Sequence, residues 1–298
     1  MEKGKPEALI VGANGLVGAK LSGALASGGI TAEGTFNKRH KSSLKKLDLS
    51  DTAEIEDFFS KASYRAVFNC ANLSGGVDFC QSNPEMAASF HLHATQKLGA
   101  LCNRMGAVLV FISSDYVFDG SGEAPRKEDD SPNPLNLYGK LKLMAEEWIK
   151  ANVKKYIIIR TTNVFGWDPE TVTANYIMNL YRTVKCGKCF NAPSYLWGNP
   201  TFAGDLAEAI TELYQNGSRG LFHVVGSSAV NRYDWAMKAC DILGLDRSLV
   251  KETKEPPAGM IPRPLKSFLD TRKFTSNCRT VLHDMSEGLK LMKSEMGR

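Results

Sequence analysis

The chain has 298 residues, of which 43% are hydrophobic and 23% are charged. This is the composition of a soluble globular protein, and the length suits one large domain or two closely joined ones. The 37 basic and 32 acidic side chains leave a net charge of +5 without a long basic run, so we expect no nucleic-acid partner. No apolar stretch reaches 18 residues, so we expect no membrane span.

The seven cysteines follow no even framework of spacings. This favours reduced thiols and a cytoplasmic location. Cys186 and Cys189 form one Cys-x-x-Cys pair, but neither a second pair nor two histidines stand at ligand spacing. We therefore predict no metal site.

A glycine-rich turn follows the first expected strand. Residues 8–11 form a short apolar run, Gly12, Gly15 and Gly18 follow at regular spacing, and a helical pattern runs to residue 27. Strand, glycine turn and helix in this order predict a nucleotide-binding site. Gly12 permits the tight turn, Gly15 lets the backbone approach a pyrophosphate, and Gly18 lets the helix pack closely. The helix N-terminus adds N–H groups for the phosphates.

The end of the second strand, expected over residues 32–36, bears on the choice of cofactor. A cofactor site for NAD would place an acidic residue there, but Asn37 follows, then Lys38 and Arg39. Basic side chains suit the 2′-phosphate of NADP, so the sequence favours NADP over NAD. A solvated basic loop would show the same pattern.

Further cofactor contacts are expected from two other parts of the first third. One is the segment around Asp48, before a helical stretch at residues 52–61 that Asp51 could cap. The other is the strand over residues 66–72, whose small residues at its carboxyl end leave room for a ligand. Residues 84–105 are expected to form one long helix containing His91 and His93. The predicted cofactor contacts in this third of the chain are Gly12, Asn14, Gly15, Leu16, Val17, Asn37, Lys38, Arg39, Asp48, Leu49, Cys70, Ala71 and Asn72.

A tyrosine and a lysine stand four residues apart at the start of an expected helix. Tyr138 and Lys142 therefore share a helical face, and an ammonium beside a phenol lowers the pKa of the phenol. This makes Tyr138 a candidate general acid, although most pairs of this kind are solvated surface pairs. The strand over residues 107–112 ends in Ser113 and Ser114. A hydroxyl there would complete a Ser–Tyr–Lys set. In such a set the serine binds the substrate oxygen, the tyrosine donates the proton and the lysine holds the nicotinamide ribose.

Longer motifs accompany these residues in a fixed order along nearly the whole chain. After the glycine turn they are Phe111-Ile112-Ser113-Ser114-Asp115-Tyr116-Val117-Phe118-Asp119-Gly120, Pro132-x-Pro134-x-x-x-Tyr138-Gly139-x-x-Lys142-x-x-x-Glu146, Arg160-Thr161-x-x-Val164-Phe165-Gly166, Pro200-Thr201-Phe202-x-x-Asp205-Leu206-Ala207 and Arg263-Pro264-x-x-Ser267-x-Leu269-Asp270. With these motifs the chain resembles the extended short-chain dehydrogenases/reductases, and within them the dTDP-4-dehydrorhamnose reductase branch.

The resemblance agrees with the alternation of strands and helices in the sequence. We predict a doubly wound α/β fold of the Rossmann type, with a parallel sheet and a smaller C-terminal substrate lobe. The nucleotide-binding domain is expected over residues 1–165, with 203–240 returning to it, and the lobe over 166–202 and 241–298. The resemblance also allows a homodimer.

The resemblance implies an oxidoreductase that passes a hydride from NAD(P)H to the 4-keto group of a nucleotide-linked deoxysugar. Its catalytic residues would be Ser114, Tyr138 and Lys142, and the last two would also contact the cofactor. Tyr116 and Val117 would line the substrate pocket, and Arg263 would meet the substrate diphosphate. Ser74, Val77 and Asn163 stand where further substrate contacts are expected.

Some positions separate this chain from its neighbours in the family. Related dehydratases carry Asp-Glu after the catalytic hydroxyl, whereas Asp115 is followed here by Tyr116, which favours simple reduction. The segment 73–78, His91 and Asn163 differ from the usual residues of the rhamnose branch. Two alternatives therefore stay open. One is a reductase of another sugar or carbonyl, and the other is a non-catalytic NADP-binding subunit resembling the methionine adenosyltransferase beta subunit.

Overall fold

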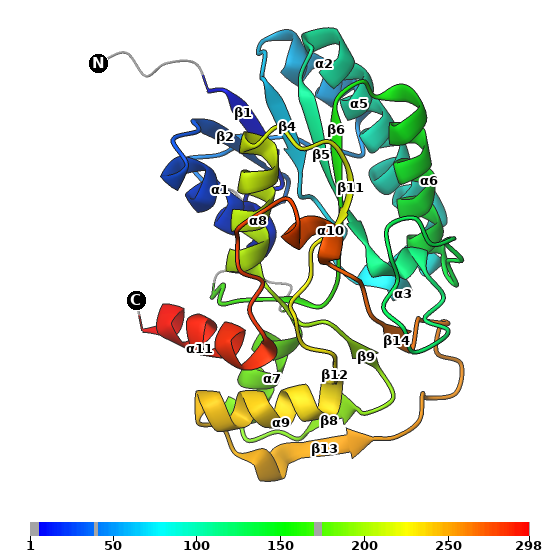
Figure 1. Cartoon of the computed structure of the whole chain (residues 1–298), viewed down its shortest axis with the longest axis vertical. Coiled ribbons are helices and arrows are strands. Elements are labelled where there is room, and N and C mark those ends of the chain that lie inside the picture. Colours follow the sequence, from blue (N-terminus) through cyan, green and yellow to red (C-terminus); the bar gives the residue numbers. More distant parts are fainter. Residues whose placement is uncertain (1–5, 39–40, 170–174, 298) are drawn as a thin grey trace.

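A parallel sheet of seven strands forms the centre of the chain, in the order β11-β6-β5-β4-β1-β2-β3 (Figure 1). The structure is a computed structural model, and it describes residues 6–38, 41–169 and 175–297. The strands are β1 (Ala8–Val11), β2 (Ala32–Phe36), β3 (Lys45–Lys46), β4 (Ala66–Asn69), β5 (Val108–Ser114), β6 (Tyr156–Thr161) and β11 (Gly220–His223). β1 and β4 are buried along their whole length. Strands buried on both faces consist mostly of apolar residues, which explains the apolar runs in the sequence.

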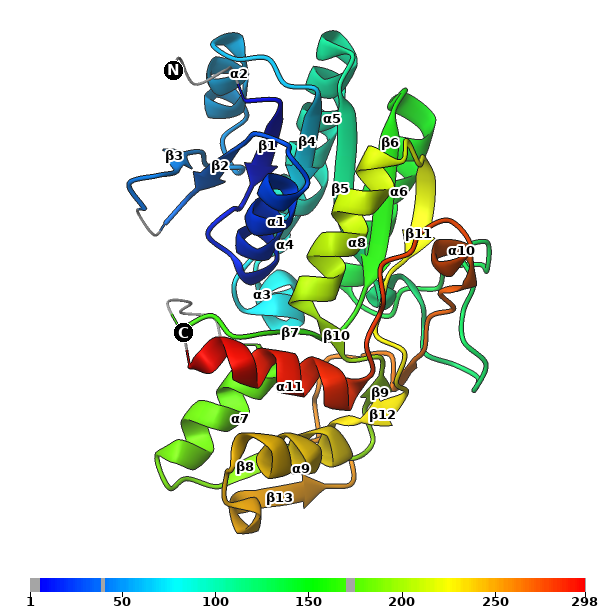
Figure 2. The ribbon, with the colours of Figure 1, turned by 60° about the vertical axis from the view of Figure 1, so that its left-hand side comes forward.

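Helices cover both faces of this sheet (Figures 1 and 2). α1 (Leu16–Ser27) and α8 (Ala203–Gln215) pack together on one face, where Leu21, Leu25 and Leu206 meet Ile10 and Phe68. On the other face lie α2 (Thr52–Ser60), α5 (Ala94–Met105) and α6 (Leu137–Asn152). The predicted doubly wound α/β fold is confirmed. The strand order reverses at β1, and in such sheets ligands bind at the carboxyl ends beside that reversal.

One predicted helix is interrupted. The segment 84–105 consists of α4 (Pro84–Ala88), a π-helical turn η1 (Ser89–His93) and α5. A π-turn inserts one residue into the helical repeat, so the side chains after it face differently from those of a regular helix. His91, within this turn, is buried.

A smaller lobe lies beyond the carboxyl ends of the sheet (Figure 2). Its helices α7 (Tyr176–Lys185), α9 (Arg232–Leu243) and α11 (Met285–Met296) enclose a core around Trp235 and Phe165. The remaining elements are β7 (Val164–Phe165), β8 (Phe190–Pro193), β9 (Trp197–Gly198), β10 (Thr201–Phe202), β12 (Val230–Asn231), β13 (Val250–Thr253), β14 (Lys266–Ser267), α3 (Gly76–Ser82), α10 (Arg272–Thr275), η2 (Asp115–Val117) and η3 (Arg247–Leu249).

The returning segment divides between sheet and lobe. α8 and β11 belong to the sheet layer, whereas α9 packs with α7 and α11 in the lobe. The predicted domain boundaries stay a prediction. Among the helices of the described residues, none is both long and apolar enough to cross a bilayer.

Candidate active site

The turn between β1 and α1 is closed by its glycines. Gly12 has a φ of +80°, and a Cβ at this residue would lie 2.9 Å from the Cα of Ala71. A Cβ at Gly18 would lie 2.4 Å from the carbonyl oxygen of Gly12. α1 begins at Leu16 with Gly15 as its N-cap, and no side chain caps it. The N-cap glycine thus offers no side chain to the first N–H groups of α1, and a helix N-terminus of this kind can receive a phosphate.

The other predicted cofactor residues lie at the ends of neighbouring strands. Asn37 and Lys38 follow β2 directly, and Asn37 donates a hydrogen bond to Asp48. Burial raises the pKa of Asp48, but hydrogen bonds from Ser50 and Asn37 outweigh it and hold the pKa below its usual value. Arg39 lies outside the described residues.

Five more of the predicted cofactor contacts occupy different environments. Leu49 is buried, and Asn72 is exposed. Cys70 follows β4, donates its N–H to the carbonyl of Val11 at 3.0 Å, and has a thiol whose pKa burial raises to about 12. Asn14 lies in the turn before α1, and Val17 in its first turn. Together these residues and the glycines border the carboxyl ends of β1, β2 and β4, although their role stays a prediction.

The three predicted catalytic residues converge at the carboxyl end of β5. Tyr138 and Lys142 lie in the first two turns of α6, which Asn136 caps by accepting the N–H of Gly139 at 3.0 Å. Tyr138 is hydrogen-bonded to Ser114. The Ser114 hydroxyl donates to Asp115 Oδ1 at 2.9 Å and accepts the N–H of Tyr116 at 3.2 Å.

The charge state of this set differs from the sequence-based expectation. Burial raises the pKa of Tyr138, and the Ser114 hydrogen bond, which lowers it, does not overcome that rise. The Lys142 ammonium lies 5.7 Å from the Tyr138 ring centroid and donates to the carbonyl of Ile112 at 2.9 Å. Burial lowers the pKa of Lys142 to about 8. The expected lowering of the tyrosine pKa is therefore wrong for this structure, because both groups are buried and the ammonium faces a carbonyl.

Two rings flank Tyr138. The His91 ring lies edge-on with its centroid 5.4 Å from that of Tyr138, and Tyr116 does the same at 5.7 Å. Burial lowers the pKa of His91, so at neutral pH its imidazole carries no charge. The phenol thus stands protonated among uncharged rings, a state suited to donating a proton.

Asp115 ties the catalytic strand end to the lobe. Its Oδ2 accepts a short hydrogen bond from Ser267 of β14, and Thr162 donates to the same carboxylate. Burial raises the pKa of Asp115, and the three hydroxyl donors oppose that rise. Ser267 stood in one of the sequence motifs without a role. Its partner lies 152 residues away, so no local signal could have joined the two.

The predicted substrate residues are not all at one surface. Arg263 ion-pairs with Asp78 and is hydrogen-bonded to Tyr116, while Val77 lies in α3, and Ser74 lies just before that helix. Asn163 has a φ of +47°, in the left-handed region. Val117 is fully buried in a small cluster with Phe118, Val225 and Leu269, and its contact with the substrate stays a prediction.

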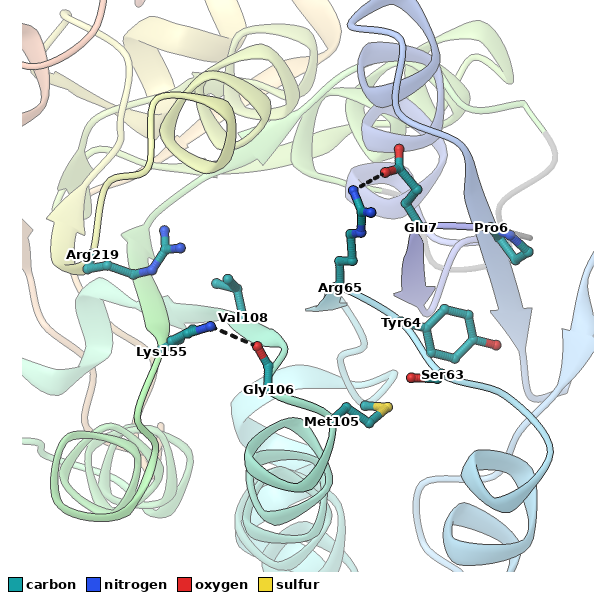
Figure 3. A pocket seen from close by; sticks show the side chains of 10 residues that line it. All are labelled: Pro6, Glu7, Ser63, Tyr64, Arg65, Met105, Gly106, Val108, Lys155 and Arg219. Carbon is teal, nitrogen blue, oxygen red and sulfur yellow. Dashed lines mark hydrogen bonds and ion pairs between the residues drawn. The ribbon is translucent and has the colours of Figure 1, made fainter. Parts of the chain in front are cut away.

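A groove of about 470 Å³ opens between α3 and the lobe. Arg263 lines it together with Arg232, a residue that sequence reasoning missed. The expected helix start at Asn231 was the local signal, since it places Arg232 in the first turn of α9. Another hollow lies at the opposite, amino-terminal edge of the sheet (Figure 3), and it contains none of the predicted site residues. It is lined by Pro6, Glu7, Ser63, Tyr64, Arg65, Met105, Gly106, Val108, Lys155 and Arg219.

The chain has a seven-stranded parallel sheet, a glycine turn where the strand order reverses, and a Ser–Tyr–Lys set in which Ser114 and Tyr138 are hydrogen-bonded. These features define an extended short-chain dehydrogenase/reductase. More particularly, the chain belongs to the RmlD substrate binding domain family, whose family model matches residues 7–297. The predicted family is confirmed, and so is the prediction of an oxidoreductase by class.

Several known proteins are similar to this chain over most of their length. A probable low-salt glycan biosynthesis reductase of Haloferax volcanii is 30% identical, with 88% of this chain and 89% of that protein covered. The dTDP-4-dehydrorhamnose reductase of Salmonella typhimurium is 29% identical over 97% of both chains. Methionine adenosyltransferase 2 subunit beta of Xenopus tropicalis is also 29% identical, covering 89% of this chain and 80% of the other.

Solved structures share the fold. A dTDP-4-dehydrorhamnose reductase of Clostridium acetobutylicum matches with a TM-score of 0.86 and 27% identity, covering 98% of this chain and 99% of that one. The enzyme of that name from Bacillus anthracis, solved in complex with NADP, gives a TM-score of 0.87 at 24% identity over 98% and 99% of the two chains. At that identity it supports the fold alone.

Proposed function

We propose that this protein uses NADPH to reduce the 4-keto group of a nucleotide-linked 6-deoxysugar. The observation that carries the proposal is the Tyr138–Ser114 hydrogen bond beside the buried ammonium of Lys142, at the carboxyl ends of the sheet. The names of the Salmonella and Clostridium relatives support this substrate class, and the Haloferax relative supports a reductase of glycan biosynthesis.

The residues around the glycine turn fit a dinucleotide. A Cβ at Gly12 or Gly18 would collide with backbone, so glycine keeps the turn tight. The N–H groups of Gly12, Ala13 and Gly15 donate within the protein, so a pyrophosphate would meet the N–H groups at the start of α1. Lys38, exposed after β2, would meet the 2′-phosphate of NADP, and none of residues 37–41 is acidic. The nicotinamide, when bound, supplies the hydride. NADP is therefore the proposed cofactor, and NAD is less well matched.

The chain's own residues supply the proton and the orientation. Tyr138, protonated because burial raises its pKa, donates its proton to the carbonyl oxygen as charge develops there. Ser114 turns its hydroxyl from Asp115 toward the same oxygen and stabilises it. Lys142 holds the nicotinamide ribose. Asp115 takes no part as an acid, because its carboxylate accepts hydrogen bonds from three hydroxyl groups, one of them from Ser267 of the lobe. This supports reduction without dehydration.

We also propose the domain division expected from the sequence, with residues 1–165 and 203–240 as the cofactor part and 166–202 and 241–298 as the nucleotide-sugar part, except that α9 packs with the lobe and is assigned to it. The carboxyl ends of β1, β4 and β5 face the lobe, so the site would lie between the two parts. A homodimer stays a prediction.

A substrate panel tests the proposal. Wild type and Tyr138→Phe are assayed for NADPH oxidation with dTDP-4-dehydro-6-deoxy-L-mannose and other keto sugars, and with NADH in place of NADPH. We expect turnover in the wild type and a loss of about 10²–10⁴-fold in the variant, the range of a general acid. Turnover of another carbonyl only would keep the reductase and overturn the sugar. A variant as active as the wild type would overturn the role of Tyr138.

The similarity to a methionine adenosyltransferase subunit favours one second candidate, a regulatory NADP-binding subunit. This candidate predicts tight NADPH binding without turnover of any keto sugar, and co-purification with a catalytic enzyme. The intact Ser114, Tyr138 and Lys142 speak for catalysis instead. Calorimetry with NADPH, combined with the substrate panel, separates the two.

A further inference from the structure

Asp115 is a buried carboxylate at the catalytic end of β5, and three hydroxyl groups surround it. The residue is 2% exposed. Its Oδ1 accepts the Ser114 hydroxyl at 2.9 Å, its Oδ2 accepts that of Ser267, and Thr162 donates to the same carboxylate. These donors come from the end of β5, from the lobe strand β14 and from the residue after β6. Of the three, the proposed reaction uses only Ser114.

The carboxylate sets the direction of the hydrogen bond between Ser114 and Tyr138. A serine hydroxyl has one proton to donate, and an ionised carboxylate has none. Because the Ser114 proton points at Asp115, the Ser114 oxygen can only accept, and Tyr138 is the donor in their hydrogen bond. The N–H of Tyr116 donates to the same serine oxygen at 3.2 Å. In the resting site the phenol therefore keeps its proton, as a reduction requires.

The charge of Asp115 acts on Tyr138 in the same sense. Burial is the larger cause of the raised pKa of Tyr138, and the Asp115 carboxylate adds to it. Other titratable groups face the phenol from α3, η1, η2 and α6. They are Cys80, His91, Tyr116 and Lys142. Burial keeps the first three uncharged at neutral pH. The ammonium of Lys142 opposes Asp115, but it donates to the carbonyl of Ile112.

Ser267 brings the lobe into this arrangement. Its strand β14 pairs with β9, where Gly198 stands opposite Ser267. A Cβ at Gly198 would lie 2.5 Å from the Nδ2 of Asn163, so the segments pack closely there. Arg232 of α9, also in the lobe, acts on Asp115 through its charge and favours the ionised form. The lobe thus stabilises the carboxylate on which the direction of the proton depends.

Three donors also allow one of them to leave. When a substrate carbonyl enters, Ser114 turns its hydroxyl toward that oxygen, and Asp115 keeps the hydrogen bonds from Ser267 and Thr162. A buried carboxylate is strongly disfavoured when no donor faces it, so the two remaining hydroxyl groups lower the cost of freeing Ser114. Asp115 stays ionised throughout, while the phenol proton passes to the carbonyl oxygen and the hydride to the carbonyl carbon.

We propose that Asp115 is a positioning residue of the reduction, which orients Ser114 so that Tyr138 is the proton donor, and that Ser267 of the lobe holds Asp115 in this role. The lobe would then do more than bind the sugar nucleotide, because it would also prepare the catalytic hydroxyl groups. The inference deepens the proposed function and rests on it, since a reduction is the reaction that needs a protonated phenol.

Titration of the phenol itself tests the proposal without a substrate. Proteins made with isotope-labelled tyrosine are titrated by NMR, and Tyr138→Phe identifies the resonance. Asp115→Asn keeps the shape, removes the charge and lets Ser114 donate to the phenolate. We therefore expect the pKa of Tyr138 to fall by about one pH unit or more. The kcat for a keto sugar should fall about tenfold or more with little change in KM, as for loss of one charge-assisted hydrogen bond.

A second pair of variants tests the part played by the lobe. Ser267→Ala removes one donor from Asp115 and leaves the catalytic residues in place. It should lower kcat several-fold, again with little change in KM, and Ser267→Thr, which keeps a hydroxyl, should recover part of the loss. Calorimetry with NADPH shows that each variant still binds the cofactor. If Ser267→Ala has the kcat of the wild type, the role of the lobe is overturned.

Asp205 provides a matched control. It is 4% exposed and lies in the first turn of α8, and it accepts the N–H of the distant His283 at 2.8 Å. The ring Nδ1 of His283 lies 2.9 Å from its other oxygen. Asp205→Asn should lower stability, because it breaks a comparable buried contact, yet leave the pKa of Tyr138 and the kcat unchanged.

The outcomes separate this inference from the proposed function. If Asp115→Asn leaves the pKa of Tyr138 unchanged, or if Asp205→Asn lowers it equally, the positioning role of Asp115 is overturned while turnover of a keto sugar still supports the proposed function. If the wild type reduces no keto sugar but Asp115→Asn lowers the pKa of Tyr138, the proposed function fails and the orientation of the two hydroxyl groups by Asp115 is upheld.

Discussion

A buried ion pair lies behind the proposed catalytic residues, and its loss has an effect that can be calculated. Glu146 and Arg160 are 0% and 1% exposed, and the carboxylate accepts from Nη2 at 2.6 Å and from Nε at 2.9 Å. Ser113 donates a third hydrogen bond to it at 2.5 Å. Glu146 lies one turn beyond Lys142 in α6, and Ser113 adjoins Ser114 in β5. The pair therefore fixes α6 against β6, and the Ser113 hydrogen bond fixes α6 against β5.

Glu146→Gln keeps the shape of the side chain and removes its charge. The guanidinium of Arg160 is then buried without a counter-charge, and breaking a buried pair in this way costs about 3–5 kcal/mol. That is a large part of a total stability of about 5–15 kcal/mol. With a slope of about 2–3 kcal/mol per molar urea, the unfolding midpoint should fall by about 1–2 M. Urea titration followed by tryptophan fluorescence measures it.

The neighbouring glutamate provides the control. Glu147 is exposed on the same helix, so Glu147→Gln should stay within about 0.5 kcal/mol of the wild type. Replacing both partners, Glu146→Leu with Arg160→Met, should recover most of the loss, because no unpaired charge is left. If Glu146→Gln lowers the free energy of unfolding by less than about 1 kcal/mol, the assignment of an uncompensated buried charge is refuted.

Three further predictions concern the cofactor side. Gly18→Ala should lower stability by about 1–3 kcal/mol and weaken NADPH binding, because its Cβ would lie 2.4 Å from a carbonyl oxygen. Gly23→Ala, whose Cβ would have nothing within 4 Å, should do neither. Equal unfolding temperatures and equal NADPH affinities for the two variants would contradict this. Burial holds the pKa of Lys142 at about 8, so its ammonium is present below that pH and is lost above it. The kcat/KM should fall as pH rises through about 8, and Lys142→Met should show a low, flat profile; a flat wild-type profile up to pH 10 would argue against the role. Lys38→Gln should weaken NADPH about tenfold and leave NADH unchanged in direct titrations, as for loss of one charged hydrogen bond, and an equal effect on both would remove the 2′-phosphate contact.

The sequence was sufficient for the parts of the fold that depend on local patterns. The buried runs at β1 and β4 and the glycines between β1 and α1 predicted a parallel sheet with a nucleotide turn, and the structure has both. A strand buried on both faces requires a continuous run of apolar residues, and a position where a Cβ would collide requires glycine. Both constraints can therefore be recognised in the sequence.

The features that the sequence could not predict depend on burial and on contacts between distant segments. The lowered pKa expected for Tyr138 ignored burial, which a four-residue spacing cannot reveal. The surroundings of Val117 likewise come from Val225 and Leu269, more than 100 residues further along, and its contact with the substrate stays a prediction. Arg232 had no motif, because its place is set by Asn163 and Tyr176 of other segments. Fine placement of a site arises from such pairs, whereas its chemistry can be recognised from local motifs.

The central claim is that the hydride reaches C4 of a nucleotide-linked keto sugar while Tyr138 gives the proton. The most direct measurement uses NADPH carrying deuterium at its transferable position, with dTDP-4-dehydro-6-deoxy-L-mannose as substrate, and locates the label in the product by mass spectrometry and NMR. The account predicts deuterium at C4 with the wild type and almost none in the same time with Tyr138→Phe. Unlabelled product, or equal labelling by both proteins, would contradict it.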